Sequence, residues 1–188
     1  MSRSKLQITT PPSGNVVTLE QVKSHLRIDG YDQDTYLSTL IISAVKLTER
    51  ATGRALLRTS FSISVDTFRD IELPKPPFVA ISSITYLDDA SQSQTLATTT
   101  YDIDDAEEPC LIVFEKDLPQ LADTRLPITI NYSAGYADAD AIPEPIKQYV
   151  LMIVGSLYDT SRSAHSEYAL HTTPTARMLI APYMVGEI

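Results

Sequence analysis

The sequence is poor in the residues on which most catalytic and metal-binding sites depend. Its 188 residues include one cysteine, three histidines, six glycines and no tryptophan. The single cysteine, Cys110, excludes an intramolecular disulfide and a zinc site built from several cysteines. Because Cys110 precedes the apolar run 111–114, we expect a buried strand residue and not a reactive thiol. The scarcity of cysteine also favours synthesis in a reducing compartment.

The glycines and histidines are too scattered to form known motifs. The glycines lie far apart in the sequence, which excludes a dinucleotide-binding fingerprint, a P-loop and a nucleophile elbow. His165 and His171 are six residues apart and His25 is remote, so no pair has helical metal-ligand spacing. The hydroxyls of residues 161–166 near His165 fit a polar loop better than a catalytic triad. The sequence therefore predicts no catalytic residue, no cofactor-binding residue and no metal ligand.

Long apolar runs are missing as well. None approaches the roughly 20 residues that a membrane-spanning helix requires. The first residues carry charges without the apolar stretch of a secretion signal. We therefore expect no membrane span and no signal peptide.

The net charge of −9 is distributed unevenly. Residues 1–60 carry eight basic and five acidic side chains, residues 61–140 carry four and fifteen, and residues 141–188 carry three and four. An acidic middle argues against nucleic-acid binding there, because phosphates require cationic partners. The acidic run 102–108 invites a calcium site, but it lacks the glycine and the final glutamate of an EF-hand loop. We interpret that run as a solvated hairpin tip.

The N-terminal part predicts two amphipathic helices. Thr18 and Gln21 form a capping box before a short helix, and an Asp-Gly break follows it. Asp32 or Asp34 is then expected to cap a longer helix, which Gly53 ends in the left-handed conformation. The apolar stripe of this longer helix consists of Leu37, Leu40, Ile41, Ala44, Val45 and Thr48.

The rest of the chain predicts strands and then two further helices. Apolar and polar residues alternate over 57–66, as is typical of a half-buried strand. Further strands are expected at residues 79–87, 101–103, 111–114 and 128–132. A helical period returns after Ile142, and a last short helix begins after Thr173 and stops before Pro182. The apolar stripe of the third helix consists of Ile146, Tyr149, Val150, Ile153, Val154, Leu157 and Tyr158.

Together these elements predict an α+β fold. Two N-terminal and two C-terminal helices form a small helical bundle, and an antiparallel β subdomain is inserted between them. We expect the following parts: an N-terminal arm at 1–16, the first two helices at 17–56, the β region at 57–136, and the C-terminal helices and tail at 142–188. Strands do not alternate with helices, so a Rossmann-type parallel sheet is not expected.

Several segments carry a family signature in their order along the chain. They are LEQVKSHLRID (19–29), the Asp-rich break at 29–34, ERATGRAL (49–56), INYSAGY (130–136) and IPEPIKQYVLMIVGSLYD (142–159). In this order the chain resembles the head–tail connector (adaptor) proteins of long-tailed bacteriophages and of phage-derived gene transfer agents. The smallest members of that family are nearly all helical. This chain is similar to the larger subtype with a β insertion.

The resemblance implies a structural virion protein that is not an enzyme and needs no cofactor. Its expected role is a head–tail connector subunit in a homo-oligomeric ring, twelve-fold on the portal protein, with a tail-side head-completion or stopper protein beyond it. DNA would pass through the ring as cargo. The protein would be synthesised in the cytoplasm of a bacterial host and reside in the virion at the head–tail interface. The alternatives are a DNA-packaging factor that contacts DNA directly, or an enzyme whose site is not visible in the sequence.

The tail at residues 182–188 is apolar but too short to form a core element alone. In relatives the C-terminal segment reaches the portal, so the resemblance implies a partner contact through Tyr183, Met184, Val185 and Ile188. Removal of the tail is then expected to leave the melting temperature of the monomer almost unchanged. The alternative is that the tail packs on its own helices.

Overall fold

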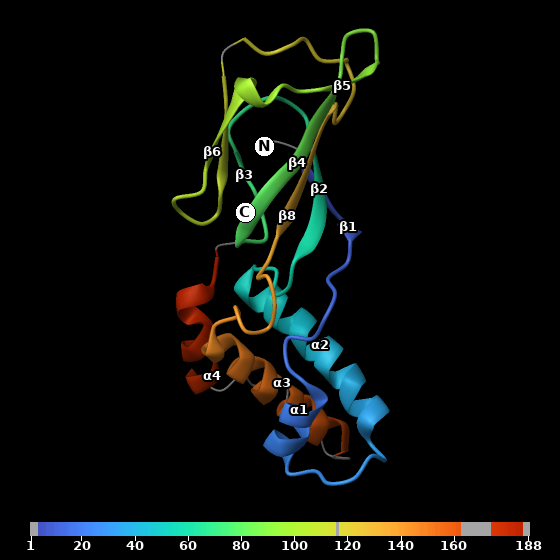
Figure 1. The fold of residues 1–188 in the computed structure, drawn as a ribbon, viewed down its shortest axis with the longest axis vertical. Helices are drawn as coiled ribbons and strands as arrows, with labels where there is room; N and C mark the ends of the chain where they lie inside the picture. The colour runs from blue at the N-terminus through green and yellow to red at the C-terminus, as the bar shows by residue number, and fades with distance from the viewer. Residues whose placement is uncertain (1–3, 116, 163–173, 186–188) are drawn as a thin grey trace. The chain divides into compact units, whose positions relative to one another are not determined.

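The computed structural model describes residues 4–115, 117–162 and 174–185. The chain divides into two compact units (Figure 1). A β unit is formed by the chain up to Ser13 together with Leu57–Gly135, and a helical unit by Gly14–Leu56 together with the chain from Tyr136 onward. The predicted α+β fold, with helices before and after an antiparallel β region, is confirmed.

The main sheet of the β unit contains five antiparallel strands in the order β1-β2-β8-β4-β5. Their bounds are Ser4–Thr10 (β1), Thr59–Val65 (β2), Ile128–Ala134 (β8), Phe78–Leu87 (β4) and Ser93–Thr95 (β5). Along β2 and β8 every second side chain is buried, because one face of the sheet covers the core. On that face the rings of Phe61 and Tyr132 stack with centroids 5.5 Å apart.

A second sheet contains three short strands in the order β3-β7-β6. These are Ile71–Glu72 (β3), Leu111–Phe114 (β7) and Tyr101–Asp104 (β6), and a 3-10 turn, η1 (Thr98–Thr100), precedes β6. The ring of Phe68 lies 5.3 Å from that of Phe114 in this sheet and 5.9 Å from that of Tyr86 in β4. Aromatic packing therefore joins the two sheets.

The N-terminal segment departs from the prediction. Residues 1–16 were expected to form an extended arm, but Ser4–Thr10 form β1 and pair in antiparallel register with β2. Six of the seven β1 residues are exposed, so the segment shows no apolar alternation that would predict a strand. The strand is held by backbone hydrogen bonds to β2, which require no particular side chains.

The helical unit contains four helices within the described residues. Their bounds are Leu19–Leu26 (α1), Asp34–Thr52 (α2), Glu144–Arg162 (α3) and Pro174–Ile180 (α4), and a 3-10 turn, η2 (Ala181–Tyr183), follows α4. The predicted capping box of α1 is confirmed. The Gln21 N–H donates to the Thr18 hydroxyl at 3.1 Å, and the Thr18 N–H donates to the Gln21 side chain at 2.8 Å.

The start of α2 differs from the prediction that Asp32 or Asp34 caps it. Gln33 occupies the N-cap position and makes no side-chain cap hydrogen bond. Its side-chain oxygen instead accepts from the Tyr158 hydroxyl at 2.9 Å. Asp34 is the first helical residue and forms an ion pair with Lys23 of α1. At the other end Gly53, with φ at +74°, ends the helix as predicted.

The predicted apolar stripes form the core of the helical unit. In α2 the residues Leu37, Leu40, Ile41, Ala44 and Thr48 are buried, and Val45 is half-buried at the edge. In α3 the buried residues are Ile146, Tyr149, Val150, Ile153, Val154 and Tyr158, with Leu157 half-buried. Helix α3 packs against both α2 and α4.

Gly135 follows β8 at a position where no other residue fits without distortion. Its φ is +109°, and a Cβ atom there would lie 2.2 Å from the backbone oxygen of Leu57. Its N–H donates to the carbonyl of Pro77 at 2.8 Å. Close backbone approach and left-handed conformation together account for the glycine of the segment INYSAGY.

Candidate interaction surfaces

Within residues 4–115, 117–162 and 174–185, no group of three His, Cys, Asp or Glu side chains could hold a metal ion. No helix in these ranges is long and apolar enough to cross a membrane. His165 and His171, with the hydroxyls of Ser163 and Ser166, lie outside the described residues.

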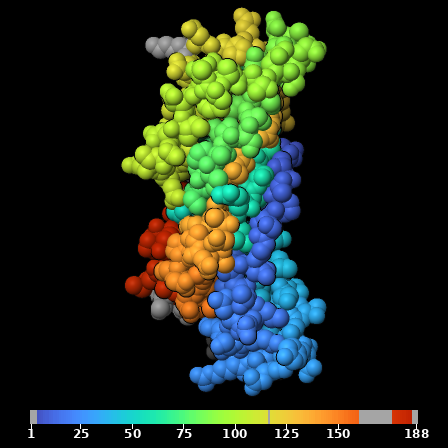
Figure 2. Space-filling model, in the orientation of Figure 1, coloured from blue at the N-terminus to red at the C-terminus, as the bar shows by residue number. Residues whose placement is uncertain are grey.

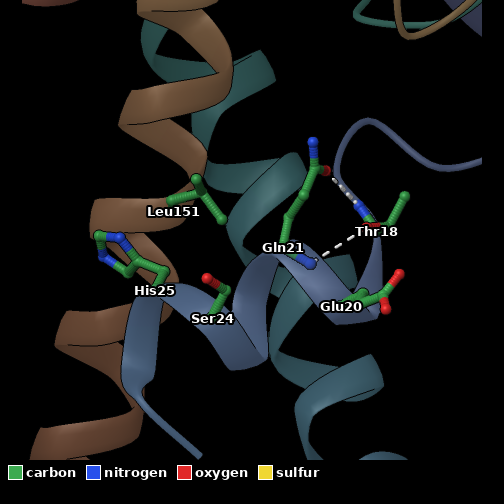
Figure 3. Close-up of a pocket in the computed structure, with 6 residues that line it drawn as sticks. All are labelled: Thr18, Glu20, Gln21, Ser24, His25 and Leu151. Carbon is green, nitrogen blue, oxygen red and sulfur yellow. Dashed lines mark hydrogen bonds between the residues drawn. The ribbon is translucent and has the colours of Figure 1, made fainter.

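His25 lies in an open hollow of about 450 Å³ beside α1 (Figure 3). The hollow is lined by Thr18, Glu20, Gln21, Ser24, His25 and Leu151. Thr18 and Gln21 are engaged in the capping box, and no hydrogen bond joins Ser24 to His25 in this described part of the chain. The His25 ring lies 3.8 Å from the position that a Cβ atom of Gly155, in α3, would occupy. The arrangement therefore indicates helix packing and not a paired nucleophile and base.

Cys110 is 1% exposed and lies directly before β7. Its carbonyl accepts from the Leu73 N–H at 2.8 Å. Burial, with smaller contributions from the charges of Asp105 and Asp104, raises the pKa of the Cys110 thiol to about 11. A thiol with this pKa is largely protonated at neutral pH, which agrees with the structural role expected from the sequence.

The acidic run 102–108 connects β6 to β7 and forms the expected hairpin. Residues 102–108 are all exposed, and the Asp104 carboxylate accepts from the Ala106 N–H at 3.2 Å. β6 is an edge strand of its sheet. This hairpin therefore presents its carboxylates to solvent, together with an unpaired strand edge.

The described part of the C-terminal tail contacts the end of α2. The Val185 N–H donates to the Thr52 carbonyl at 2.9 Å, and the Arg54 Nε donates to the Tyr183 carbonyl at 2.7 Å. Both bonds use backbone atoms of the tail, whereas the Met184 side chain is 48% exposed. Of the four predicted partner-contact residues, Tyr183, Met184 and Val185 therefore share one site, and Ile188 lies outside the described residues.

Next to this tail the helical unit has a groove of about 400 Å³, which no sequence pattern indicated. We call it the arginine groove. It is lined by Leu47, Arg50 and Ala51 of α2, Tyr149 and Ile153 of α3, Arg177 and Ile180 of α4, and Met184 of the tail. Its two arginines are 127 positions apart in the sequence, and only the packing of three helices brings them together.

Comparison with known proteins agrees with this architecture. Residues 16–106 match the family described as Phage gp6-like head-tail connector protein. None of the curated proteins matches the sequence. Among solved structures, a chain from the neck of an empty GTA particle computed with C6 symmetry has a TM-score of 0.78 at 20% identity, covering 98% of this chain and 97% of that one.

Two other solved structures give the same result. A chain in the virion of a native gene transfer agent (GTA) particle has a TM-score of 0.76 at 20% identity, covering 97% of this chain and 96% of that one. A chain in the neck of a native GTA particle computed with C12 symmetry has a TM-score of 0.76 at 20% identity, with coverages of 98% and 97%. Residues 16–106 therefore match the model of a phage head–tail connector family, and nearly the whole chain shares the fold of these GTA chains.

Proposed function

We propose that the protein is a structural connector subunit that forms a ring between the portal protein and the tail-side head-completion or stopper protein. The observation that carries the proposal is the family match combined with a fold shared over nearly the whole chain with neck chains of GTA particles. Those necks were solved with C6 and C12 symmetry, which supports a ring of twelve subunits on the portal. Under this proposal the protein acts through its interfaces and carries no catalytic site.

The charge of the chain suits a passive conduit for DNA. A net charge of −9 disfavours tight binding to phosphates, which requires cationic partners. DNA is therefore proposed to pass through the ring as cargo and not as a bound ligand. The protein is proposed to be synthesised in the cytoplasm of a bacterial host and to end in the virion at the head–tail interface.

Assembly on the portal tests this proposal. Native mass spectrometry of the purified protein, alone and mixed with the portal protein from the same genome, should show a ring of twelve copies at least on the portal. Electron microscopy of the mixture should place this ring on one end of the portal. Monomers in both samples at high concentration would contradict the proposal, and a salt-dependent gel shift with double-stranded DNA would favour direct DNA contact instead.

The C-terminal tail is the proposed portal contact, through Tyr183, Met184, Val185 and Ile188. The tail backbone is anchored to α2, so its side chains can be changed while the attachment stays. Tyr183→Ala should weaken portal binding at least tenfold, which is about 1.4 kcal/mol. Tyr31→Ala is the matched control, because Tyr31 is 84% exposed and lies in the α1–α2 connection. Equal portal affinity of the two variants would exclude Tyr183 as an anchor.

A further inference from the structure

The arginine groove has an apolar floor and cationic walls. Tyr149, Ile153 and Ile180 are 3%, 4% and 2% exposed, so the floor belongs to the packed core. Arg50 and Arg177 are exposed and come from α2 and α4, which both pack on α3. The charge of Arg177 partly offsets the rise that burial causes in the pKa of Tyr149, as expected of a guanidinium near that hydroxyl.

The arginines and apolar side chains of the groove indicate what kind of segment could bind there. No lining residue among those described is acidic, although the chain carries 24 acidic residues against 15 basic ones. Arginine is the cation best suited to interfaces, because its planar guanidinium pairs with carboxylates and is weakly hydrated. The groove therefore fits a segment that carries carboxylates beside an apolar side chain.

The chain itself contains such a segment in the hairpin between β6 and β7, which we call the acidic hairpin (residues 102–108). Asp102 and Asp104 alternate with Ile103 along an edge strand, so carboxylates lie on one side of this edge and an isoleucine on the other. Ile103 is 41% exposed, so its side chain is available to a partner. The space-filling view shows this yellow-green segment protruding from the surface of the β unit (Figure 2).

We infer that the arginine groove of one subunit binds the acidic hairpin of a neighbouring copy, and that this contact closes the ring. The inference rests on the proposed ring. A ring requires a heterologous interface, in which two different patches of the same chain complement each other. The groove and the hairpin are two such patches: they lie on different units of the chain and carry opposite charges. Each also has exposed apolar side chains, Leu47 and Met184 in the groove and Ile103 in the hairpin.

Charge exchange tests the contact in the full-length chain assembled on the portal. A groove variant, Arg50→Glu with Arg177→Glu, and a hairpin variant, Asp102→Arg with Asp104→Arg, should each raise at least tenfold the concentration at which rings form. The matched control for the groove variant is Lys46→Glu with Arg58→Glu, which also replaces two exposed basic residues by glutamate but lies outside the groove. This control should leave ring formation unchanged.

Mixing the two variants gives the decisive result. In a mixed ring the subunits alternate, so every arginine groove meets an acidic hairpin and every reversed groove meets a reversed hairpin. Equal amounts of the two variants should therefore form rings that neither forms alone, with equal numbers of each subunit by native mass spectrometry. Rings from the groove variant alone, or no rings from the mixture, would overturn the inference.

The outcomes separate this inference from the proposed function. If the wild-type protein forms no ring on the portal, the proposed function itself fails. If the groove variant no longer binds the portal and the hairpin variant does not restore its assembly, the occupant is an acidic segment of the portal and the inference is wrong.

A cross-link gives a second measurement in case the charge changes unfold the chain. Ile103→Cys copies are mixed with differently tagged Leu47→Cys copies, since Leu47 lines the groove and is 37% exposed. A short bis-maleimide should link the two tagged chains on the portal, and buried Cys110 is the internal control for an inaccessible thiol. Absence of a cross-linked heterodimer in assembled rings would overturn the contact.

Discussion

The Nε of Arg54 donates a hydrogen bond to the backbone carbonyl of Tyr183 at 2.7 Å. Arg54 comes directly after Gly53, the residue that ends α2, and is 7% exposed. The Val185 N–H adds a second bond to the Thr52 carbonyl. The end of the second helix therefore holds the C-terminal tail by its backbone, and the tail contributes to the packing of the helical unit.

Truncation after Pro182 should accordingly lower the free energy of unfolding by about 1–3 kcal/mol, because a buried guanidinium loses an acceptor and Thr52 loses a donor. This differs from the expectation drawn from the sequence that the tail adds nothing to monomer stability. Chemical denaturation followed by circular dichroism measures the change. Truncation after Val185 keeps both bonds and is the control. Identical midpoints for the two truncated chains would show that the bonds contribute nothing.

Gly135→Ala should lower the free energy of unfolding by at least about 3 kcal/mol, because left-handed strain adds to a clash with the Leu57 carbonyl. Gly30→Ala is the matched control: Gly30 also has a positive φ, +84°, but nothing lies within 4 Å of its would-be Cβ. That variant should lose only about 1–2 kcal/mol. Equal losses in urea denaturation would mean that the backbone near Leu57 moves aside easily.

The raised pKa of Cys110 predicts a loss of stability at alkaline pH. In the unfolded chain the thiol ionises near its ordinary pKa of 9.0, whereas in the folded chain its pKa is about 11. The stabilisation is therefore complete below pH 9 and is lost as the pH rises to about 11. Cys110→Ala should show a shallower decline over this window when unfolding is measured at each pH. Parallel curves would contradict the buried-thiol assignment, as would rapid reaction of the native thiol with a thiol reagent at pH 8.

The turn between β4 and β5 predicts a carboxylate that titrates low. The Gln94 side chain, and then the Gln92 N–H, donate to Asp88 and hold its pKa below the usual range. This contribution to stability is present above the ordinary pKa and is lost as the pH falls through the lowered one. Gln94→Ala should raise the pKa of Asp88 in an NMR titration. Gln92→Ala is the control, since its backbone donor remains; equal pKa values in the two variants would exclude the side-chain bond as the cause.

The helical unit was largely predictable because its signals are local. The Thr18–Gln21 capping box and the apolar stripes of α2 and α3 depend on residues three or four positions apart. The start of α2 was misjudged because a tertiary contact took precedence over local capping. Asp34 pairs with Lys23, and Gln33 bonds to Tyr158, which lies 125 positions away.

Features held by backbone atoms or by distant partners were not predictable. β1 pairs with residues that lie at least 50 positions away and shows no apolar alternation, so the sequence predicted only an extended arm there. The packing that joins the two sheets depends on aromatic contacts around Phe68, which no spacing indicates. The arginine groove was missed for the same reason, because Arg50 and Arg177 each look like ordinary exposed helix residues in the sequence.

β2 and β8 pair along their full length, from Thr59 opposite Ala134 to Val65 opposite Ile128. The two ends of the segment between Leu57 and Gly135 therefore lie next to each other in the structure. This segment could be lengthened, replaced or removed, because a short bridge would join its two ends. Removal would also take away β2, the pairing partner of β1. Removal of the segment between Leu57 and Gly135 would leave two neighbouring ends, and the order of the helices before and after it would stay unchanged.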